Sequence, residues 1–325
     1  MSHIKIKKPW DVEDKELTPE SVYMRRREFL KGTALVTAAT IGAFYGCNSG
    51  PLPDPEARVE LTDLEKTIYP AKLNPRFTED HLDRSLTDEK VAASFNNFYE
   101  FSSNKVDPRR HAQRLVLRPW AVEVSGLVHK PRTFDIDDLL RTMPIEERMY
   151  RFRCVEAWAM SVPWTGFPLK ALLDLVEPQA KATHVRMTTF YLPMTAQEQL
   201  KFWYPWPYTE GMTIAEASNE LTFMATGLYG HPLPKQNGAP VRLVVPWKYG
   251  FKNIKSVVKI ELTASKPETF WNTLIPHEYD FVANVDPRVP HPRWSQAQEK
   301  LIGTEVVRPT IPFNGYGNYV AKMYA

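Results

Sequence analysis

The sequence predicts an α+β fold class, in which a single mixed α/β domain makes up most of the chain. Three observations lead to this prediction. Segments with the alternating pattern of β-strands are interleaved with short segments that carry helical caps or a helical apolar face. The chain has 28 prolines and no internal repeat, so we expect many ordered loops rather than long helices. Its 325 residues are 43% hydrophobic, which is enough to bury one sizeable core.

The first ordered element of this domain is expected within residues 86–101. Thr87 or Asp88 can cap a helix there, because a short side-chain oxygen accepts a hydrogen bond from an unpaired amide of the first turn. The segment ends in an aromatic cluster that begins beside Asn96 and Asn97. We therefore predict a short helix followed by a loop with two amide side chains.

The next elements lead to the one cysteine of the domain. Residues 120–128 alternate between polar and apolar side chains like a strand. Residues 133–143 follow as a short helix capped by Asp135. Residues 148–154 form a further strand, which ends at Cys154.

A helix is predicted after the cysteine, within residues 162–178, and Pro178 ends it. Its apolar residues have the spacing of one helical face: Leu169, Leu172, Leu173 and Val176. A capped helix is expected at 213–220. Strands are expected at 183–192, 221–229, 241–247 and 256–264. Residues 266–325 are loop-rich and aromatic, so we expect them to wrap the core rather than form another domain.

Residues 1–46 have the order of an export signal, with a basic stretch followed by an apolar stretch and small residues. Arg26 and Arg27 open the pattern RRxFLK that the Tat translocase reads, although Arg25 stands where Ser or Thr is usual. The apolar stretch 33–46 is shorter than the roughly 20 residues of a membrane-spanning helix. We expect a cleaved or lipid-anchored signal, and an amphipathic or membrane-spanning helix is the alternative.

Cys47 directly follows this signal. Gly46 and Cys47 could end a lipoprotein cleavage box, but Phe44 and Tyr45 are bulkier than the residues such boxes carry. Without lipidation, Cys47 leaves with the signal. Residues 47–85 are rich in proline and charge, and we expect them to form an extended linker that wraps the domain.

Composition and missing motifs exclude several classes of function. The 41 basic and 38 acidic residues are spread along the chain, which argues against nucleic acid as a partner. There is no GxSxG, HExxH, Walker loop or CxxC, and the eight histidines form no pair at ligand spacing. The one GxG, at Gly315 and Gly317, lacks a third glycine and a preceding strand. Hydrolase, zinc and nucleotide sites are therefore not supported.

Cys154 is the candidate for chemistry, because removal of the leader leaves it as the only thiol. We expect Arg151 and Arg153 to lower its pKa, which suits a nucleophile or a metal ligand. Glu156 would project to the same side if the chain is extended there. A soft thiolate beside a proton-carrying group fits metal redox chemistry. The alternative is a buried cysteine that acts as a small hydrophobe.

Four stretches together strongly resemble the family of periplasmic, molybdenum-dependent protein-methionine-sulfoxide reductase catalytic subunits, within the sulfite oxidase fold superfamily. They are RCVEAWAMSVPWTGFPL, NNFYEF, PKQNGAPVRLVVPWKYGFKNIKSV and HPRWSQA. The resemblance runs in the same order from about Asn96 to Trp294. It implies that residues 86–325 are a molybdopterin-binding oxidoreductase domain of the sulfite oxidase type, without a C-terminal immunoglobulin-like dimerisation domain.

The same resemblance implies that Mo-molybdopterin is the cofactor and that Cys154 binds molybdenum. It also implies that the following residues contact the pterin: Asn96, Tyr99, Glu100, Thr189, Asn237, Arg242, Asn253, Ile254 and Lys255. Arg and Lys can pair with its phosphate, while Asn and Thr match the polar rim of its ring. Members of the family often carry glycine where Asn253 stands. We hypothesise that Glu156 and Asn97 lie near the open face of the metal and supply protons and polar contacts.

Each of these residues also has a plainer interpretation. Arg242 could be a surface charge on a strand, and Lys252 and Lys255 could be solvated. The aromatic residues Trp158, Trp164 and Trp247 are expected in the core or the pocket wall rather than in catalysis.

The activity that the resemblance implies is reduction of methionine sulfoxide in oxidised envelope proteins by oxygen-atom transfer. Its implied electron donor is a membrane haem-binding, quinol-linked subunit. One alternative is a sulfite-oxidising or small-sulfoxide enzyme of the same fold. The roughly 60 residues after 256–264 are too few for the about 100 of an immunoglobulin-like sandwich, so a monomeric reductase is favoured. A non-enzymatic scaffold is the other alternative.

Overall fold

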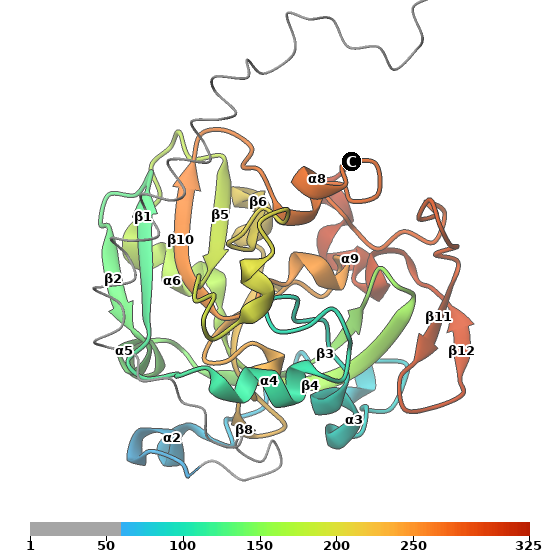
Figure 1. Ribbon diagram of the computed structural model, residues 1–325, viewed down its shortest axis with the longest axis horizontal. Helices are drawn as coiled ribbons and strands as arrows, with labels where there is room; N and C mark the ends of the chain where they lie inside the picture. The colour runs from blue at the N-terminus through green and yellow to red at the C-terminus, as the bar shows by residue number, and fades with distance from the viewer. Residues whose placement is uncertain (1–59) are drawn as a thin grey trace, which may run out of the picture. The chain divides into compact units, whose positions relative to one another are not determined.

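The computed structural model of the protein describes residues 60–325 (Figure 1). The predicted export signal at 1–46, the possible lipid anchor at Cys47 and the first part of the predicted linker lie outside the described residues. Among residues 60–325, no helix is both long enough and apolar enough to span a membrane.

Five strands form the first mixed sheet of the described chain, in the order β2-β1-β10-β5-β6. They are β1 (Ala121–Gly126), β2 (Arg132–Asp135), β5 (His184–Thr189), β6 (Thr209–Thr213) and β10 (Val257–Thr263). β1 runs parallel to β10, and the other pairs are antiparallel. β1 alternates between exposed and buried residues because one face of the sheet packs on the core.

The second mixed sheet takes seven strands from the described chain, with β12-β11-β4-β7-β8 in line, β3 beside β4 and β9 beside β7. They are β3 (Glu146–Arg153), β4 (Trp158–Pro168), β7 (Phe223–Leu228), β8 (His231–Pro232), β9 (Arg242–Val244), β11 (Gln298–Leu301) and β12 (Val307–Pro309). β4 is almost entirely buried. The two mixed sheets confirm the predicted mixed α/β fold.

Short helices connect the strands. The α-helices are α2 (Asp63–Ile68), α3 (Glu89–Ser94), α4 (Pro108–His111), α5 (Ile136–Thr142), α6 (Leu169–Val176), α7 (Ile214–Ala217), α8 (Phe270–Leu274) and α9 (Gly317–Val320). Single turns of 3₁₀-helix are η2 (Glu79–His81), η3 (Ala112–Arg114), η4 (Gln197–Leu200), η5 (Lys235–Asn237), η6 (Gly250–Lys252), η7 (Pro312–Gly315) and η8 (Ala321–Met323). Local capping residues determine where several of them begin.

The predicted helix caps are confirmed. Asp88 accepts hydrogen bonds from the first turn of α3, and Asp135 does the same for α5. Thr213 and Glu216 form a reciprocal capping box at α7. α6 buries the four apolar residues predicted from their spacing, namely Leu169, Leu172, Leu173 and Val176.

The ends of the described chain contribute more structure than the sequence indicated. The stretch before residue 86, expected to be extended, contains α2 with a capping box at Thr62, and the Tyr69 hydroxyl donates to the carbonyl of Thr226. Residues 266–325 do not merely wrap the core. Their strand β11 pairs in parallel with β4, so this region extends the second sheet (Figure 1). Pairing of this kind depends on distant residues, which a local pattern does not reveal.

Candidate active site

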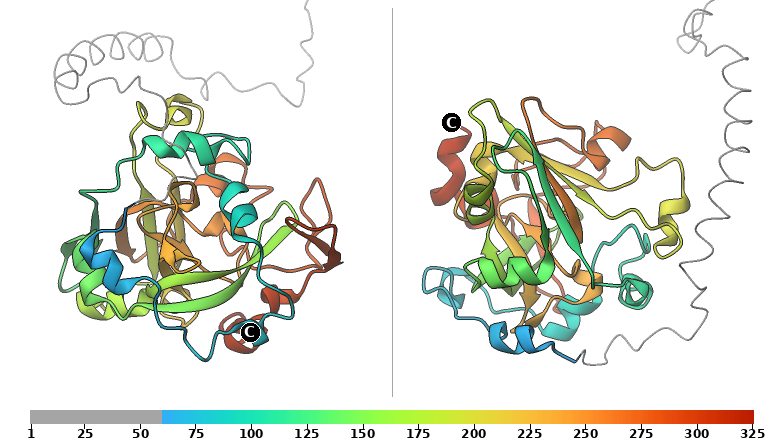
Figure 2. Two further views of the ribbon diagram at one scale, coloured as in Figure 1. Left: turned by 90° about the horizontal axis from the view of Figure 1, so that it is seen from below. Right: turned by 90° about the vertical axis from the view of Figure 1, so that its left-hand side faces the viewer.

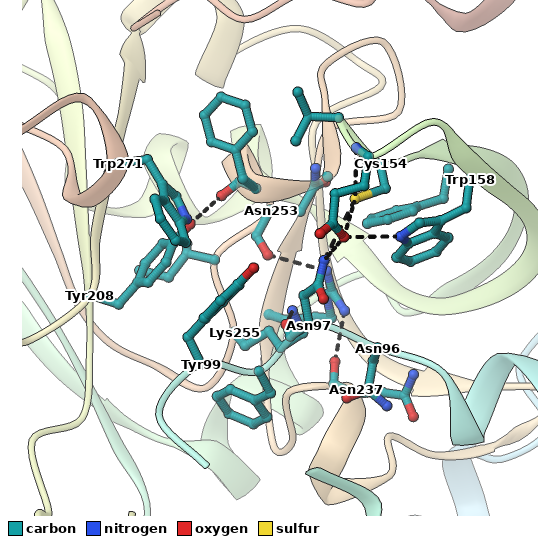
Figure 3. A pocket seen from close by; sticks show the side chains of 18 of the residues that line it. Asn96, Asn97, Tyr99, Cys154, Trp158, Tyr208, Asn237, Asn253, Lys255 and Trp271 are labelled. Carbon is teal, nitrogen blue, oxygen red and sulfur yellow. Dashed lines mark hydrogen bonds between the residues drawn. The ribbon is translucent and has the colours of Figure 1, made fainter. Parts of the chain in front are cut away.

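A pocket of about 760 Å³, part of it open to solvent, is lined by strand residues of the second sheet and by loops between the strands. Its walls come from the loop after α3, the end of β3, the start of β9, the loop before β10 and the segment leading to β6. Figure 3 shows Cys154 and Trp158 on one side of it, with Tyr99, Tyr208 and Trp271 on the other. A pocket of this size accommodates a cofactor or a small ligand.

The turn between β3 and β4 places Cys154 in the pocket wall. The Cys154 amide donates to the carbonyl of Trp158, and the Ala157 amide donates to the carbonyl of Cys154. Ala157 adopts a left-handed φ of 65°, which turns the chain sharply. The conditional expectation of an extended chain at Glu156 is therefore wrong, because the hairpin requires a turn. Cys154 is 4% exposed and lines the pocket.

Glu156 and Asn97 nevertheless lie beside the sulfur. Oε2 of Glu156 and Nδ2 of Asn97 are each 3.6 Å from Sγ of Cys154. Asn97 donates to Glu156 at 2.9 Å, and Nζ of Lys105 forms an ion pair with it at 3.0 Å. Burial would raise the pKa of Glu156, but the hydrogen bonds from Asn97 and Lys105 together lower it. These contacts favour an ionised carboxylate next to the sulfur.

The prediction that two arginines lower the pKa of the thiol is wrong. Burial, followed by the negative charge of Glu156, raises the pKa of Cys154 to about 12, and Arg153 opposes this only weakly. Arg151 and Arg153 point to the other face of β3 from Cys154, where they pair with Asp83 and Glu299. A thiolate here would need a positive charge directly at the sulfur, such as a bound metal.

Two cations line the pocket without a carboxylate at ion-pair distance within residues 60–325. Arg242 is 2% exposed, and its guanidinium donates to the carbonyls of Asn237 and Asn253. Burial lowers its pKa to about 9. Burial, followed by the charge of Arg242, lowers the pKa of Lys255 to about 7. The plainer interpretation of these residues as solvated surface charges is wrong.

Glu100 is a buried carboxyl that interacts electrostatically with Lys255. Burial raises the pKa of Glu100 to about 7. Burial therefore weakens the charge of Glu100 and of Lys255 alike near neutral pH. Nζ of Lys255 donates to the carbonyl of Asn97 at 2.6 Å. The positive charge of Arg242 is thus left without a carboxylate partner among the described residues of the pocket wall.

Three asparagines predicted from the resemblance also lie at the pocket. Both polar side-chain atoms of Asn96 are buried without a partner, and so is Oδ1 of Asn237. Asn253 has a φ of −93°, so its backbone does not require the freedom of glycine. Its side chain accepts from the amide of Val245 and donates to the carbonyl of Tyr249, and its own carbonyl accepts from Arg242.

The structure brings the predicted residues together with one difference. All of the predicted pterin contacts line the pocket except Thr189. The hydroxyl of Thr189 donates to the carbonyl of Ser256 at 3.0 Å, one layer behind the wall. Among the tryptophans, Trp158 lines the pocket, while Trp164 and Trp247 are fully buried, as expected.

Sequence reasoning missed one aromatic wall of the pocket, formed by Tyr208, Trp271 and Tyr279. Trp271 stacks on Tyr279 at 4.9 Å and meets Tyr99 edge-on at 4.9 Å. The available signal was the aromatic content of 202–208 and 270–281, but the spacing of those residues does not specify which rings face a pocket.

The donor set defines the kind of group that the pocket can hold. Unbalanced buried cations favour an anion, unpaired amide atoms favour a polar ring, and a thiol at one end favours a soft metal. No cluster of three or more His, Cys, Asp or Glu side chains within residues 60–325 could hold a metal by protein ligands alone. A metal held here would therefore depend on ligands from a bound organic group.

Comparisons with known proteins identify the class of protein to which this pocket belongs. Residues 110–271 match the family described as the oxidoreductase molybdopterin binding domain. The fold and site are those of a molybdopterin-dependent oxidoreductase, and Mo-molybdopterin fits the donor set of the pocket.

A curated relative narrows the class. The protein-methionine-sulfoxide reductase catalytic subunit MsrP of Burkholderia mallei (strain ATCC 23344) is 44% identical over 97% of this chain and 93% of its own length. The chain belongs to the family of MsrP catalytic subunits. This confirms the family that the sequence motifs indicated.

A solved structure is also similar, at a lower level. The sulfane dehydrogenase SoxCD from Paracoccus pantotrophus is 18% identical, with a TM-score of 0.41, and the match covers 66% of this chain and 60% of that one.

Proposed function

We propose that this protein reduces methionine sulfoxide in oxidised proteins to methionine. The observation that carries the proposal is the position of Cys154 in the pocket wall, with Glu156 and Asn97 beside its sulfur and unbalanced cations deeper in the pocket. The name of the 44% identical relative supports the same substrate class. The balanced reaction converts the sulfoxide, two electrons and two protons into a thioether and water.

Several residues of the pocket would hold the cofactor. Cys154 would be the protein's ligand to molybdenum, and Arg242 and Lys255 would pair with the phosphate of the pterin. The remaining contacts would come from Asn96, Tyr99, Glu100, Asn237, Asn253, Ile254 and Thr189. When bound, the molybdenum supplies two-electron chemistry toward the oxygen of the sulfoxide.

The chain's own residues would orient the substrate and handle protons. Nδ2 of Asn97 can donate a hydrogen bond to the sulfoxide oxygen. Oε1 of Glu156 accepts from Nζ of the half-buried Lys105 at 3.0 Å, which connects this carboxylate to solvent. Glu156 is the proton-carrying group nearest the sulfur, so it can pass protons from solvent to the oxygen through Oε2, while Lys105 holds its carboxylate in place. The aromatic wall would exclude bulk water from the reacting atoms.

Location and electron supply follow from the same proposal. The twin-arginine pattern and the family support export through the Tat translocase to the periplasm. The relative's designation as a catalytic subunit supports a partner, which we propose to be a membrane haem-binding subunit that passes on electrons from quinol. A periplasmic repair enzyme needs such a supply, because the chain carries no CxxCH or iron-sulfur spacing of its own.

The decisive experiment combines metal analysis with turnover of methionine sulfoxide, before and after Cys154→Ser. We expect the variant to lose molybdenum-dependent turnover by at least about 10³-fold, since the metal loses its protein ligand. Thr165→Ser, on β4 and equally buried outside the pocket, is the matched control. Full turnover by Cys154→Ser would contradict the proposal, as would a wild-type protein that oxidises sulfite but leaves sulfoxides unreduced.

The role of Glu156 has its own test. Glu156→Gln keeps the shape of the side chain but removes its capacity to relay protons, so turnover should fall about 10- to 100-fold and its pH profile should change. An unchanged rate and pH profile would remove Glu156 from the mechanism while leaving the assignment of Cys154 intact.

A further inference from the structure

The segment between β5 and β6 exposes an unusual concentration of large hydrophobic side chains. Of the fourteen such residues found exposed within 60–325, six lie on residues 191–203, here called the aromatic loop. They are Tyr191, Leu192, Met194, Leu200, Phe202 and Trp203. Phe202 is 89% exposed and Met194 is 75% exposed. Phe202 and Trp203 are in edge contact with each other, and such a concentration of exposed apolar side chains marks a candidate interaction site.

The base of the aromatic loop is anchored to the domain, so the exposure of its tip is built into the fold. The side chain of Gln199 is buried and closes the loop, because it donates to the carbonyl of Phe190 and accepts from the amide of Leu192. At one end, Phe190 packs against Phe101. At the other end, Tyr204 stacks on the buried ring of Phe270. Phe190 is buried and Tyr204 is half-buried, whereas the rings next to them along the chain, Tyr191 and Trp203, are exposed.

A basic helical turn lies beside the aromatic loop. Figures 1 and 2 place α4 next to the segment between β5 and β6. Phe190, directly before the aromatic loop, packs against Phe101, and the carbonyl of Phe101 in turn contacts the ring of His111 in α4. Residues 105–114 carry four basic side chains and one acidic one. Arg110 and Arg114 are exposed and have no ion pair among the described residues. Within the aromatic loop, Lys201 and Glu198 pair with each other.

We propose that the aromatic loop and the adjacent basic turn form a surface that binds the face of an anionic lipid bilayer. Trp, Tyr and Phe are the side chains that settle at the boundary between headgroups and acyl chains. Exposed arginines beside them complement anionic headgroups. The charge of the neighbouring turn favours a lipid surface over a neutral polypeptide groove. This proposal concerns attachment and does not depend on the proposed reaction.

Vesicle flotation of the full chain tests the surface. We expect the wild type to bind vesicles that contain phosphatidylglycerol, and the double variant Phe202→Ser/Trp203→Ser to bind at least about fivefold less, since two interfacial aromatic rings are removed. The matched control is Val306→Ser/Val307→Ser, which removes exposed apolar residues next to and within β12. Residues 1–59 are the same in all variants, so a difference between variants reports the aromatic loop.

The basic turn is tested separately by Arg110→Glu/Arg114→Glu. Its binding should fall on vesicles with phosphatidylglycerol and stay unchanged on vesicles of phosphatidylcholine alone, because only the former are anionic. Melting temperature and turnover of a small sulfoxide should match the wild type in every variant, which separates attachment from folding and from the proposed reaction.

Two results would overturn the proposal. One is equal vesicle binding by Phe202→Ser/Trp203→Ser and the β12 control. The other is a raised KM for an oxidised unfolded protein in the loop variant with unchanged vesicle binding, which would assign the aromatic loop to polypeptide substrates instead.

Discussion

The buried cations of this protein fall into two groups, one outside the pocket and one inside it. Outside, Nζ of Lys252 lies 2.6 Å from Glu210, and Nζ of Lys248 lies 2.5 Å from Glu216. Inside, Arg242 has only carbonyl and aromatic partners among the described residues. The fold therefore balances the buried charges that serve its own stability. It leaves the pocket charge unbalanced, which fits an anionic cofactor that completes the site.

The largest effect on cofactor binding should come from removing the unbalanced arginine. Arg242→Met removes the proposed buried partner of the pterin phosphate, so cofactor affinity should fall by about 100-fold, corresponding to roughly 3 kcal/mol for a buried charge-assisted pair. The measurement is the molybdenum and pterin content after dialysis. Arg186→Met, which removes a half-exposed arginine on β5, is the control and should retain the cofactor. Full retention of molybdenum and pterin by Arg242→Met would contradict the view that the unpaired arginine serves the cofactor.

Breaking a buried ion pair outside the pocket should reduce the stability of the fold rather than the affinity for the cofactor. Glu210→Gln leaves Lys252 buried without a counter-charge, so the free energy of unfolding of cofactor-free protein should fall by about 3–5 kcal/mol. Urea unfolding measures this. Glu305→Gln breaks an exposed pair with Lys300 and should cost less than about 1 kcal/mol. Equal losses in the two variants would show that burial does not distinguish these pairs.

The pH dependence of the free energy of unfolding should differ between two buried glutamates, Glu100 in the pocket wall and Glu216 outside it. Burial raises the pKa of Glu100 to about 7 from its ordinary 4.5, so the folded state holds a proton that the unfolded state has released between these values. Cofactor-free protein should therefore lose stability from this group as the pH rises from about 4.5 through 7. The loss should be on the order of 3 kcal/mol and absent in Glu100→Gln.

The pKa of Glu216 is shifted in the opposite direction, so its contribution to stability depends on pH in the opposite sense. Burial by itself would raise the pKa of Glu216, but Lys248 and Tyr324 lower it. The stabilisation from Glu216 is therefore present above pH 4.5 and is lost as the pH falls. Urea unfolding at stepped pH separates the two groups. A wild-type profile between pH 4.5 and 7 identical to that of Glu100→Gln would contradict the unbalanced pocket.

The smallest effect is expected at Thr189. Its hydroxyl donates to the carbonyl of Ser256 behind the pocket wall, so Thr189→Val should cost about 1 kcal/mol of stability and change cofactor content by less than about twofold. The measurement is the cofactor content of Thr189→Val, compared with that of Asn237→Ala, which removes a side chain that lines the pocket. A loss as large as that of Asn237→Ala would show that Thr189 reaches the cofactor.

Much of the local structure could be predicted because its causes are local. Asp88, Asp135 and Thr213 cap helices through hydrogen bonds to residues two or three positions away, and the face of α6 follows from a spacing of three and four. The pairing of β11 with β4 could not be read in this way. It joins residues more than 130 positions apart, and nothing in the short segment 298–301 specifies its partner.

The candidate site was predicted through resemblance, since its motifs are separated by long stretches of chain. Asn96, Cys154 and Arg242 meet only in the folded protein. Local reasoning was wrong about the pKa of Cys154, because it counted arginines that are neighbours in sequence. Alternation along β3 sends those arginines to the opposite face.

The sequence by itself determined the mixed α/β class, the positions of about half of the described α-helices and strands, the one thiol of the domain and the family. Only the tertiary structure decided which cations lack a counter-charge, which rings line the pocket and in which direction the pKa of the thiol shifts. Hydrogen bonds and apolar periodicity act over a few residues, so sequence spacing carries them. Burial and electrostatic potential act through space, and they depend on which distant segments pack together.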